Sequence, residues 1–160
     1  MKRIMAMAMV SVLIASWAMA GDTGSWFDME KCEFCKPMME TKGLMSHMKW
    51  EHHNIADGTL SITKVDDDYV DAYKKAEAKM DVVAKRWMGG EKVYVCNMCK
   101  SMGAIMQAGA KTDNIESGNT FIQVTSSTDP EVVNMIHGWT DRTNSEMKAM
   151  AQKETPAHKY

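Results

Sequence analysis

The sequence predicts an α+β fold in which two similar halves form a roughly four-stranded sheet backed by helices. Three observations predict it. A Cys-x-x-Cys-Lys-x-Met motif occurs twice, residues 59–65 alternate between apolar and polar side chains, and residues 69–87 repeat apolar side chains at helical spacing. With 160 residues, of which 45% are hydrophobic, the chain is long enough to build one domain around its own core.

The two motifs are the first of four landmarks that recur in the same order in both halves. Each motif is followed by an Asn-Ile pair, a strand-like segment and an Asp that opens a helical pattern. Landmarks in one order favour duplication over coincidence. The predicted domain, residues 21–160, therefore contains two repeats, about 26–90 and 91–152, and a short flexible tail. The landmarks start at Cys32, Asn54, Thr59 and Asp67, and at Cys96, Asn114, Thr120 and Asp129.

Each repeat is predicted to run as strand, Cys-x-x-Cys, helix, strand and helix. The β-branched and aromatic residues at 92–95 favour a strand that leads into the second motif, with 26–29 as its weaker counterpart. A helix is predicted to follow each motif. Residues 59–65 and 120–125 then suit half-buried strands.

The closing helix of each repeat has recognisable ends. In the first repeat the helix is predicted over 67–88, because an Asp can cap its start and Gly89-Gly90 stops it. In the second repeat, Thr128-Asp129-Pro130-Glu131 forms a capping box with Pro in the first turn, and the helix is predicted to run to about residue 152.

The order of strand, Cys-x-x-Cys and helix resembles that of heavy-metal-associated domains of the ferredoxin-like class. That resemblance implies a two-layer sandwich of the ferredoxin-like type and a metal held by the motif. It covers only the motif. Glu30-Lys31 and Tyr94-Val95 stand where that class has Gly-Met before the first Cys, so no family is assigned.

The first twenty residues have the pattern of a secretory signal peptide. Lys2 and Arg3 precede an apolar run, and Ala18-Met19-Ala20 offers small residues at a cleavage site. The run is shorter than the roughly 20 residues of a membrane span, and no later stretch is apolar enough to cross a bilayer. We expect cleavage after Ala20 and a periplasmic or secreted protein without a membrane span.

Four cysteines in two close pairs leave three interpretations open. Cys32, Cys35, Cys96 and Cys99 supply the thiolates of a tetrahedral site for zinc or copper(I), which is the favoured interpretation. Structural disulfides suit an oxidising compartment, and a thiol-disulfide oxidoreductase uses the same motif. In each pair, the start of a helix and a nearby Lys favour the thiolate form of the cysteines over the thiol. If the halves pack about a twofold axis, the two pairs converge into one site.

A second group of soft donors occurs in the first repeat only. A helix over about 43–53 would place Met45, Met48 and His52 on one face, which suits an accessory copper site, with His47 or His53 as a further ligand. The alternative is that the methionines pack in the core and the histidines are dispersed.

Composition and motifs exclude several function classes. A formal net charge of −2 lacks the basic excess of nucleic acid-binding proteins. The sequence has no Gly-x-Ser-x-Gly, no His-Glu-x-x-His and no Gly-rich phosphate loop, which disfavours an enzyme. The predicted function is binding of a soft metal ion for storage, delivery or sensing, with a periplasmic protein as a further partner.

Overall fold

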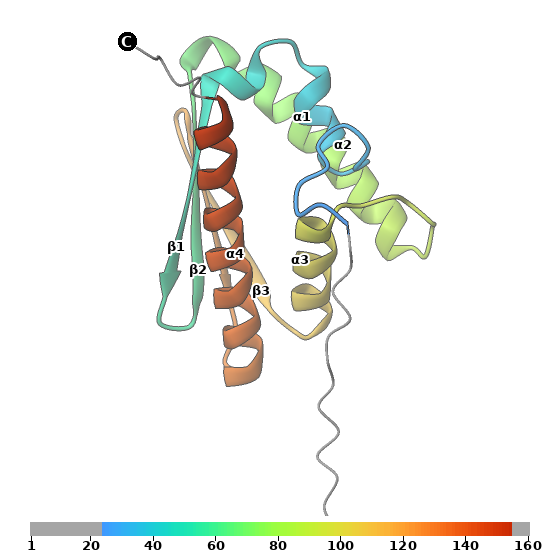
Figure 1. Ribbon diagram of the computed structural model, residues 1–160, viewed down its shortest axis with the longest axis vertical. Helices are drawn as coiled ribbons and strands as arrows, with labels where there is room; N and C mark the ends of the chain where they lie inside the picture. Colours follow the sequence, from blue (N-terminus) through green and yellow to red (C-terminus); the bar gives the residue numbers. More distant parts are fainter. Residues whose placement is uncertain (1–23, 155–160) are drawn as a thin grey trace, which may run out of the picture.

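The computed structural model describes residues 24–154, so the predicted signal peptide at 1–20 and the tail from residue 155 lie outside the described residues. The centre of the fold is a four-stranded antiparallel sheet with the strand order β1-β2-β4-β3 (Figure 1). This confirms the α+β class. The strands are β1 (Met48–Ile55), β2 (Gly58–Val65), β3 (Lys111–Ser117) and β4 (Thr120–Ser126).

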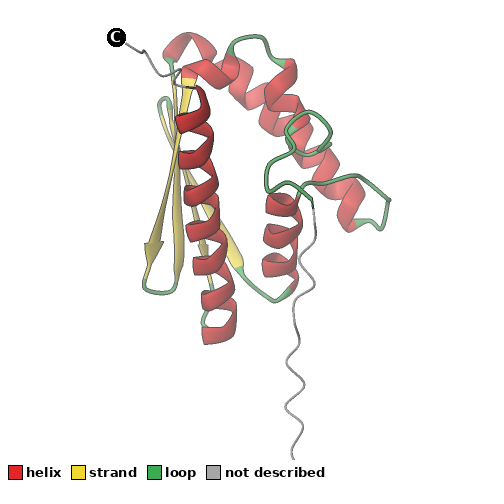
Figure 2. Cartoon of the chain, in the orientation of Figure 1, coloured by secondary structure: helices red, strands yellow, loops and turns green. Residues whose placement is uncertain are grey.

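The helices lie before and after each hairpin of the sheet (Figure 2). Each half therefore runs as Cys-x-x-Cys, helix, hairpin and helix. In the first half these are α1 (Lys36–Glu40) with the 3-10 turn η1 (Leu44–His47), then the 3-10 turn η2 (Asp67–Tyr69) with α2 (Val70–Met88). In the second half they are α3 (Asn97–Gln107) and α4 (Pro130–Glu154).

Five of the predicted elements are confirmed within a few residues. The strands predicted at 59–65 and 120–125 are β2 and β4, and the closing helices are α2 and α4. The helix predicted after the second motif is α3. In these segments the apolar residues recur at one clear spacing, either that of a strand or that of a helix, so the local sequence determines the type of element.

The strands predicted to lead into the motifs are wrong, and so is the order of elements built on them. Residues 26–29 and 92–95 belong to no strand. Val95 is instead buried beside the cysteines, and the carbonyl of Tyr94 accepts one backbone hydrogen bond, from the Glu33 amide. The apolar side chains of these segments pack around the motifs, and the segments do not pair with any strand of the sheet. The sheet is made of two hairpins, which differs from the β-α-β units of a ferredoxin-like sandwich.

The helix predicted over 43–53 is also wrong, because β1 occupies most of that segment. Met48 pairs with Val65 and every following residue of β1 has a partner in β2. The side chains of Met48, Trp50 and His52 point to one face of the sheet, and the residues between them point to the other. Donors three and four residues apart fit a helix, but the two-residue alternation of the same segment fits a strand equally well.

The helices cover one face of the sheet, which we call the inner face. The start of α2 packs there through Tyr73, whose ring lies 4.5 Å from that of Phe121. Along the rest of this face lies α4, where the ring of Trp139 meets His52 edge-on at 5.2 Å. Thr59 and Thr125 are fully buried beneath α4. A first core cluster joins α1, η1 and α2 to the sheet, and consists of Met38, Leu44, Met48, Val65, Tyr73 and Ala76.

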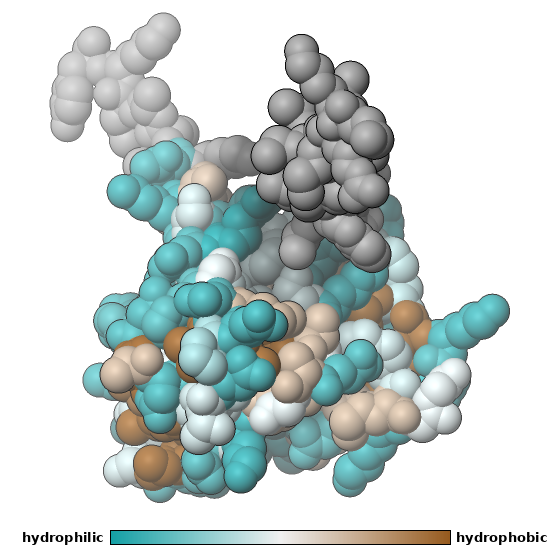
Figure 3. All heavy atoms as spheres, turned by 90° about the horizontal axis from the view of Figure 1, so that it is seen from below, coloured by the Kyte–Doolittle hydropathy of each residue, from teal (hydrophilic) through white to brown (hydrophobic). Residues whose placement is uncertain are grey.

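Hydrophilic side chains predominate on the end of the molecule shown in Figure 3, and hydrophobic ones appear there in small groups. Within residues 24–154 no helix combines the length and the apolar character that a membrane span requires.

Burial of His52 predicts an acid-sensitive fold. Burial, and then the charge of His53, lowers the pKa of His52 from 6.5 to about 4. Between these values the unfolded chain takes up a proton that the folded chain does not, so stability falls as pH falls from 6.5 to 4. We expect a loss of up to about 3 kcal/mol from this group.

Urea unfolding of the wild type and of His52→Gln at pH 7.5 and pH 4.5 checks the prediction. The variant should lose less stability on acidification than the wild type. His53→Gln, at an exposed position on the opposite face, should retain most of the wild-type loss because burial is the larger cause. An equal pH dependence in wild type and His52→Gln would contradict the prediction.

Candidate metal centre

The four cysteines meet at one buried point between the two halves. The Sγ atom of Cys99 lies 3.8 Å from that of Cys32 and 3.5 Å from that of Cys35, and Cys35 lies 3.9 Å from Cys96. All four sulfur atoms lie within 4.8 Å of one another. Each side chain is at most 6% exposed, and none of the four forms a disulfide.

Tight turns of backbone present the thiols of each pair to the same side. The carbonyl of Cys32 accepts hydrogen bonds from the amides of Cys35, at 3.1 Å, and Lys36, at 2.9 Å. In the second pair, the carbonyl of Cys96 accepts from the amide of Lys100 at 2.9 Å. Cys35 is the residue before α1, and Cys96 holds the same position before α3. Each motif therefore borders the start of a helix, but α1 begins after the second cysteine of its motif and α3 after the first cysteine of its own.

Polar contacts on the surface tie the two motifs together. Glu33, inside the first motif, accepts a hydrogen bond from the amide of Tyr94 at 3.3 Å and pairs with Arg86 at 3.2 Å. Arg86 also binds Glu91. These contacts fasten the first motif to the end of α2 and to the segment that enters the second motif. Lys36 is not the source of this connection, since it pairs with Glu40 of its own helix.

An apolar shell separates the thiols from water. It is built from the segments before the motifs, from the first motif itself, from α2 and from α3. The ring of Trp87 reaches α3 so closely that a Cβ on Gly103 would lie 2.5 Å from it, so only glycine leaves room for that ring. The sequence marked Trp87 as part of a helical stripe without indicating the cysteines as its neighbours. The shell consists of Met29, Phe34, Trp87, Val93, Val95 and Met98.

Hydrogen bonds between the thiols divide them into two acidic and two weakly acidic groups. The hydrogen bond with Cys35 lowers the pKa of the Cys32 thiol to about 6, and the hydrogen bond with Cys32 lowers the pKa of Cys96. The pKa values of Cys35 and Cys99 are raised, first by hydrogen bonding to Cys32 and then by other thiols and burial. An ion that takes four thiolates must therefore displace protons from this site.

The spacing of the sulfur atoms matches a tetrahedral metal site. Zinc–sulfur bonds of about 2.3 Å give tetrahedral edges of about 3.8 Å. The distances of 3.5–3.9 Å bracket that edge. Among residues 24–154, this is the group of His, Cys, Asp or Glu side chains whose ligand atoms lie close enough to hold an ion. The four cysteines lie close enough together to bind one metal ion.

The predicted accessory donors are distributed over the first hairpin and its approach. Met45 and Met48 pack in the first core cluster. The Nδ1 atom of His52 lies 2.8 Å from the Ser61 hydroxyl on the inner face, whereas His53 lies on the opposite face near Glu51. His47 pairs with Asp66 and stacks on Tyr69. The helical face on which the accessory copper site was predicted is therefore absent from this segment.

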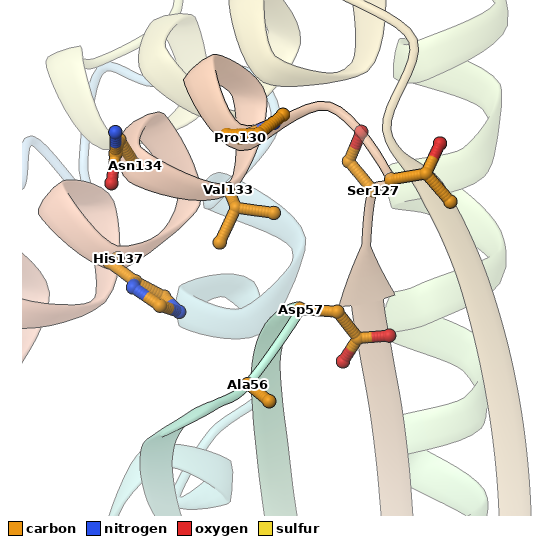
Figure 4. A pocket seen from close by; sticks show the side chains of 8 residues that line it. Ala56, Asp57, Ser127, Pro130, Val133, Asn134 and His137 are labelled. Carbon is orange, nitrogen blue, oxygen red and sulfur yellow. The ribbon is translucent and has the colours of Figure 1, made fainter.

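A shallow depression of about 570 Å³ lies elsewhere, between the β1–β2 turn and the start of α4 (Figure 4). His137 points into it from α4, but its Nε2 atom is 2.9 Å from the carbonyl oxygen of Ile55. Asp57, on the turn, uses its backbone carbonyl to accept from the amide of Ser127. The depression contains no nucleophile paired with a base, and the cysteines are not part of its lining.

Comparison with known proteins yields no match to a family model, to a curated protein or to a solved structure. The functional conclusion therefore rests on the geometry of the four cysteines.

Proposed function

We propose that this protein binds one soft metal ion, zinc or copper(I), through Cys32, Cys35, Cys96 and Cys99. The observation that carries the proposal is the mutual approach of four buried sulfur atoms at tetrahedral edge distances. Thiolates select soft ions, and a complete shell of four sulfurs suits zinc in particular. Each half of the chain supplies two of the four ligands, so the bound ion would connect the two halves.

Closure of the site favours storage, delivery or sensing over catalysis. A catalytic zinc keeps one position open for water or substrate, whereas four protein thiolates fill a tetrahedral shell. All four cysteines are almost fully buried, and aromatic and thioether side chains surround them. Release of the ion would require the motifs to move apart or a partner protein to exchange ligands with them.

A thiol-disulfide oxidoreductase is the second candidate, because the pKa of Cys32 is lowered to about 6. A thiolate at neutral pH is the attacking group of such enzymes. Cys32 is, however, 0% exposed, so a substrate disulfide would have no direct access to its sulfur. Burial of all four thiols makes metal binding the better supported function.

Two further proposals follow from the sequence. A periplasmic or secreted location would be set by the predicted signal peptide, and the metal would protect the thiols from oxidation there.

Internal duplication would explain why two motifs, two hairpins and two closing helices occur in the same order in both halves, and why each half contributes one cysteine pair.

Metal content and thiol accessibility of the protein, purified without reducing agent, test the proposed function. We expect about one zinc or copper ion per chain and four thiols that react with an alkylating agent only after chelation or denaturation. Cobalt(II) offers a probe of the geometry, because tetrahedral thiolate coordination gives intense visible absorption. Ion binding should release protons and strengthen as pH rises. Metal-free protein with two disulfides that exchange rapidly with a dithiol would instead support the oxidoreductase.

A further inference from the structure

The face of the sheet opposite the helices, which we call the outer face, carries a continuous group of aliphatic side chains. The strand register places Leu60 beside Val124 and Ile62 beside Ile122 on the two central strands. Ile115 continues the second of these rows on β3. The group consists of Ile55, Leu60, Ile62, Ile115, Ile122 and Val124.

No described element of residues 24–154 packs on this aliphatic group. None of its members belongs to the three core clusters. Ile115 is 55% exposed, and the other five are half-buried. Side-chain contacts between helices and sheet fall on the inner face instead, such as Trp139 with His52 and Tyr73 with Phe121. An uncovered aliphatic sheet face of this kind marks an interaction surface.

Charged side chains of both signs border the aliphatic group. Lys49, Glu51 and His53 lie on the β1 edge, and Lys111 and Asp113 lie on the β3 edge. The central strands contribute only Lys64 to the charges of this face. Such a mixed border lacks the basic excess that nucleic acid or an anionic membrane would require. It is the border expected of a protein interface.

We propose that the outer face binds the outer face of a second copy of this chain around a twofold axis parallel to the strands. This axis reverses the order of the strands, so the sheet β1-β2-β4-β3 of one copy faces β3-β4-β2-β1 of the other. β2 of one copy then covers β4 of the other. The register aligns Leu60 with Val124 of the other copy, and Ile62 with Ile122. Sheets packed face to face in this way bury the aliphatic residues of both copies.

The charges at the border fit this arrangement. Each β1 edge covers the β3 edge of the other copy, which sets His53 opposite Asp113 twice. Lys49 lies opposite Ser117, and Lys64 opposite Thr120. The twofold axis therefore places an imidazole beside a carboxylate twice, and it places no two like charges directly opposite one another. Glu51 and Lys111 lie opposite Ile115 and Ile55, at the border of the interface.

The face is large enough for a weak, reversible dimer. Four strands of seven or eight residues cover roughly 19 Å by 26 Å, or about 500 Å² per copy. Two copies would bury about 1,000 Å², which is below the size of stable interfaces and within the range of transient ones. We therefore expect a reversible dimer with a dissociation constant in the micromolar range, about −8 kcal/mol in free energy.

Sedimentation velocity in reducing buffer tests the proposal, and the metal-loaded wild type should be dimeric at about 100 μM. Ile62→Glu buries two charges at the centre of the interface and should weaken dimerisation at least about 100-fold. Val82→Glu is the matched control, because Val82 is an apolar residue of α2 that is 56% exposed and lies away from this face. It should leave the dimer intact, and both variants should keep the wild-type metal content.

Charge reversal tests the orientation. Asp113→Lys removes the carboxylate opposite His53 and should weaken the dimer about 10-fold, and addition of His53→Glu should restore it, because the two positions then carry opposite charges. A monomeric wild type, a dimer that survives Ile62→Glu, or equal loss in Val82→Glu would overturn the proposal. A monomer would mean that another protein or the chain outside residues 24–154 covers this face. Metal content reports on the proposed function separately from all of these outcomes.

Discussion

Cys32→Ser and Cys96→Ser should weaken binding of zinc and copper(I) by the same large factor. Both sulfur atoms belong to one buried cluster, with Cys32 3.8 Å from Cys99 and Cys96 3.9 Å from Cys35. Loss of a hydrogen-bond partner that only orients a ligand weakens metal binding about 10–100-fold, so loss of a thiolate itself should cost at least about 100-fold. Competition titration against a chelator of known affinity measures both variants.

Met39→Leu is the matched control for these two substitutions. Met39 is a soft donor close to the first motif, but its side chain is 44% exposed and lies outside the cluster. It should bind metal as the wild type does. Strongly unequal losses in Cys32→Ser and Cys96→Ser would show that the pairs bind separately, and would contradict a shared site.

Gly58→Ala should destabilise the fold by about 3 kcal/mol or more. Gly58 starts β2 opposite Ser126, and a Cβ there would lie 2.0 Å from the backbone oxygen of Thr125. Backbone atoms of β4 cannot give way as a flexible side chain can, so the substitution forces the two central strands apart and lies at the upper end of overpacking costs. Chemical denaturation of the metal-loaded protein measures the loss.

Gly138→Ala should have the opposite effect and stabilise the fold. Gly138 lies within α4, and a Cβ there would meet no atom within 4 Å. Alanine is the better helix former, so the variant should gain up to about 1 kcal/mol. Equal effects of the two substitutions would show that the close approach of β2 and β4 at Gly58 does not govern stability.

Local sequence determined those elements in which the apolar residues follow a single spacing, that of a strand or that of a helix. β2 alternates on both sides of Ile62, and α2 repeats its buried residues at helical spacing from Tyr73 to Val83, so neither depends on distant segments to define its type. The start of α4 was specified by Asp129, whose carboxylate accepts a hydrogen bond from the Glu131 amide at 2.8 Å. The spacing of the two cysteine pairs indicated thiolate chemistry before any geometry was known.

The first strand shows where local information fails. Met45, Met48 and His52 fit the spacing of a helix, while Met48, Trp50 and His52 fit that of a strand. Pairing with β2 over eight residues, and burial of Met48 in the core, stabilise the strand. The Asp57-Gly58 dipeptide after this segment is a hairpin signal that could have decided between the two patterns.

The sequence by itself determined the α+β class, the main helices, the central strands and the four cysteines as ligand candidates. Tertiary structure alone decided that the cysteines meet, that Trp87 and Val95 enclose them, and that no helix within residues 24–154 covers the aliphatic face of the sheet. The physical reason is distance along the chain. Cys32 and Cys99 are 67 residues apart, and their approach depends on how both halves pack together, which no local period encodes.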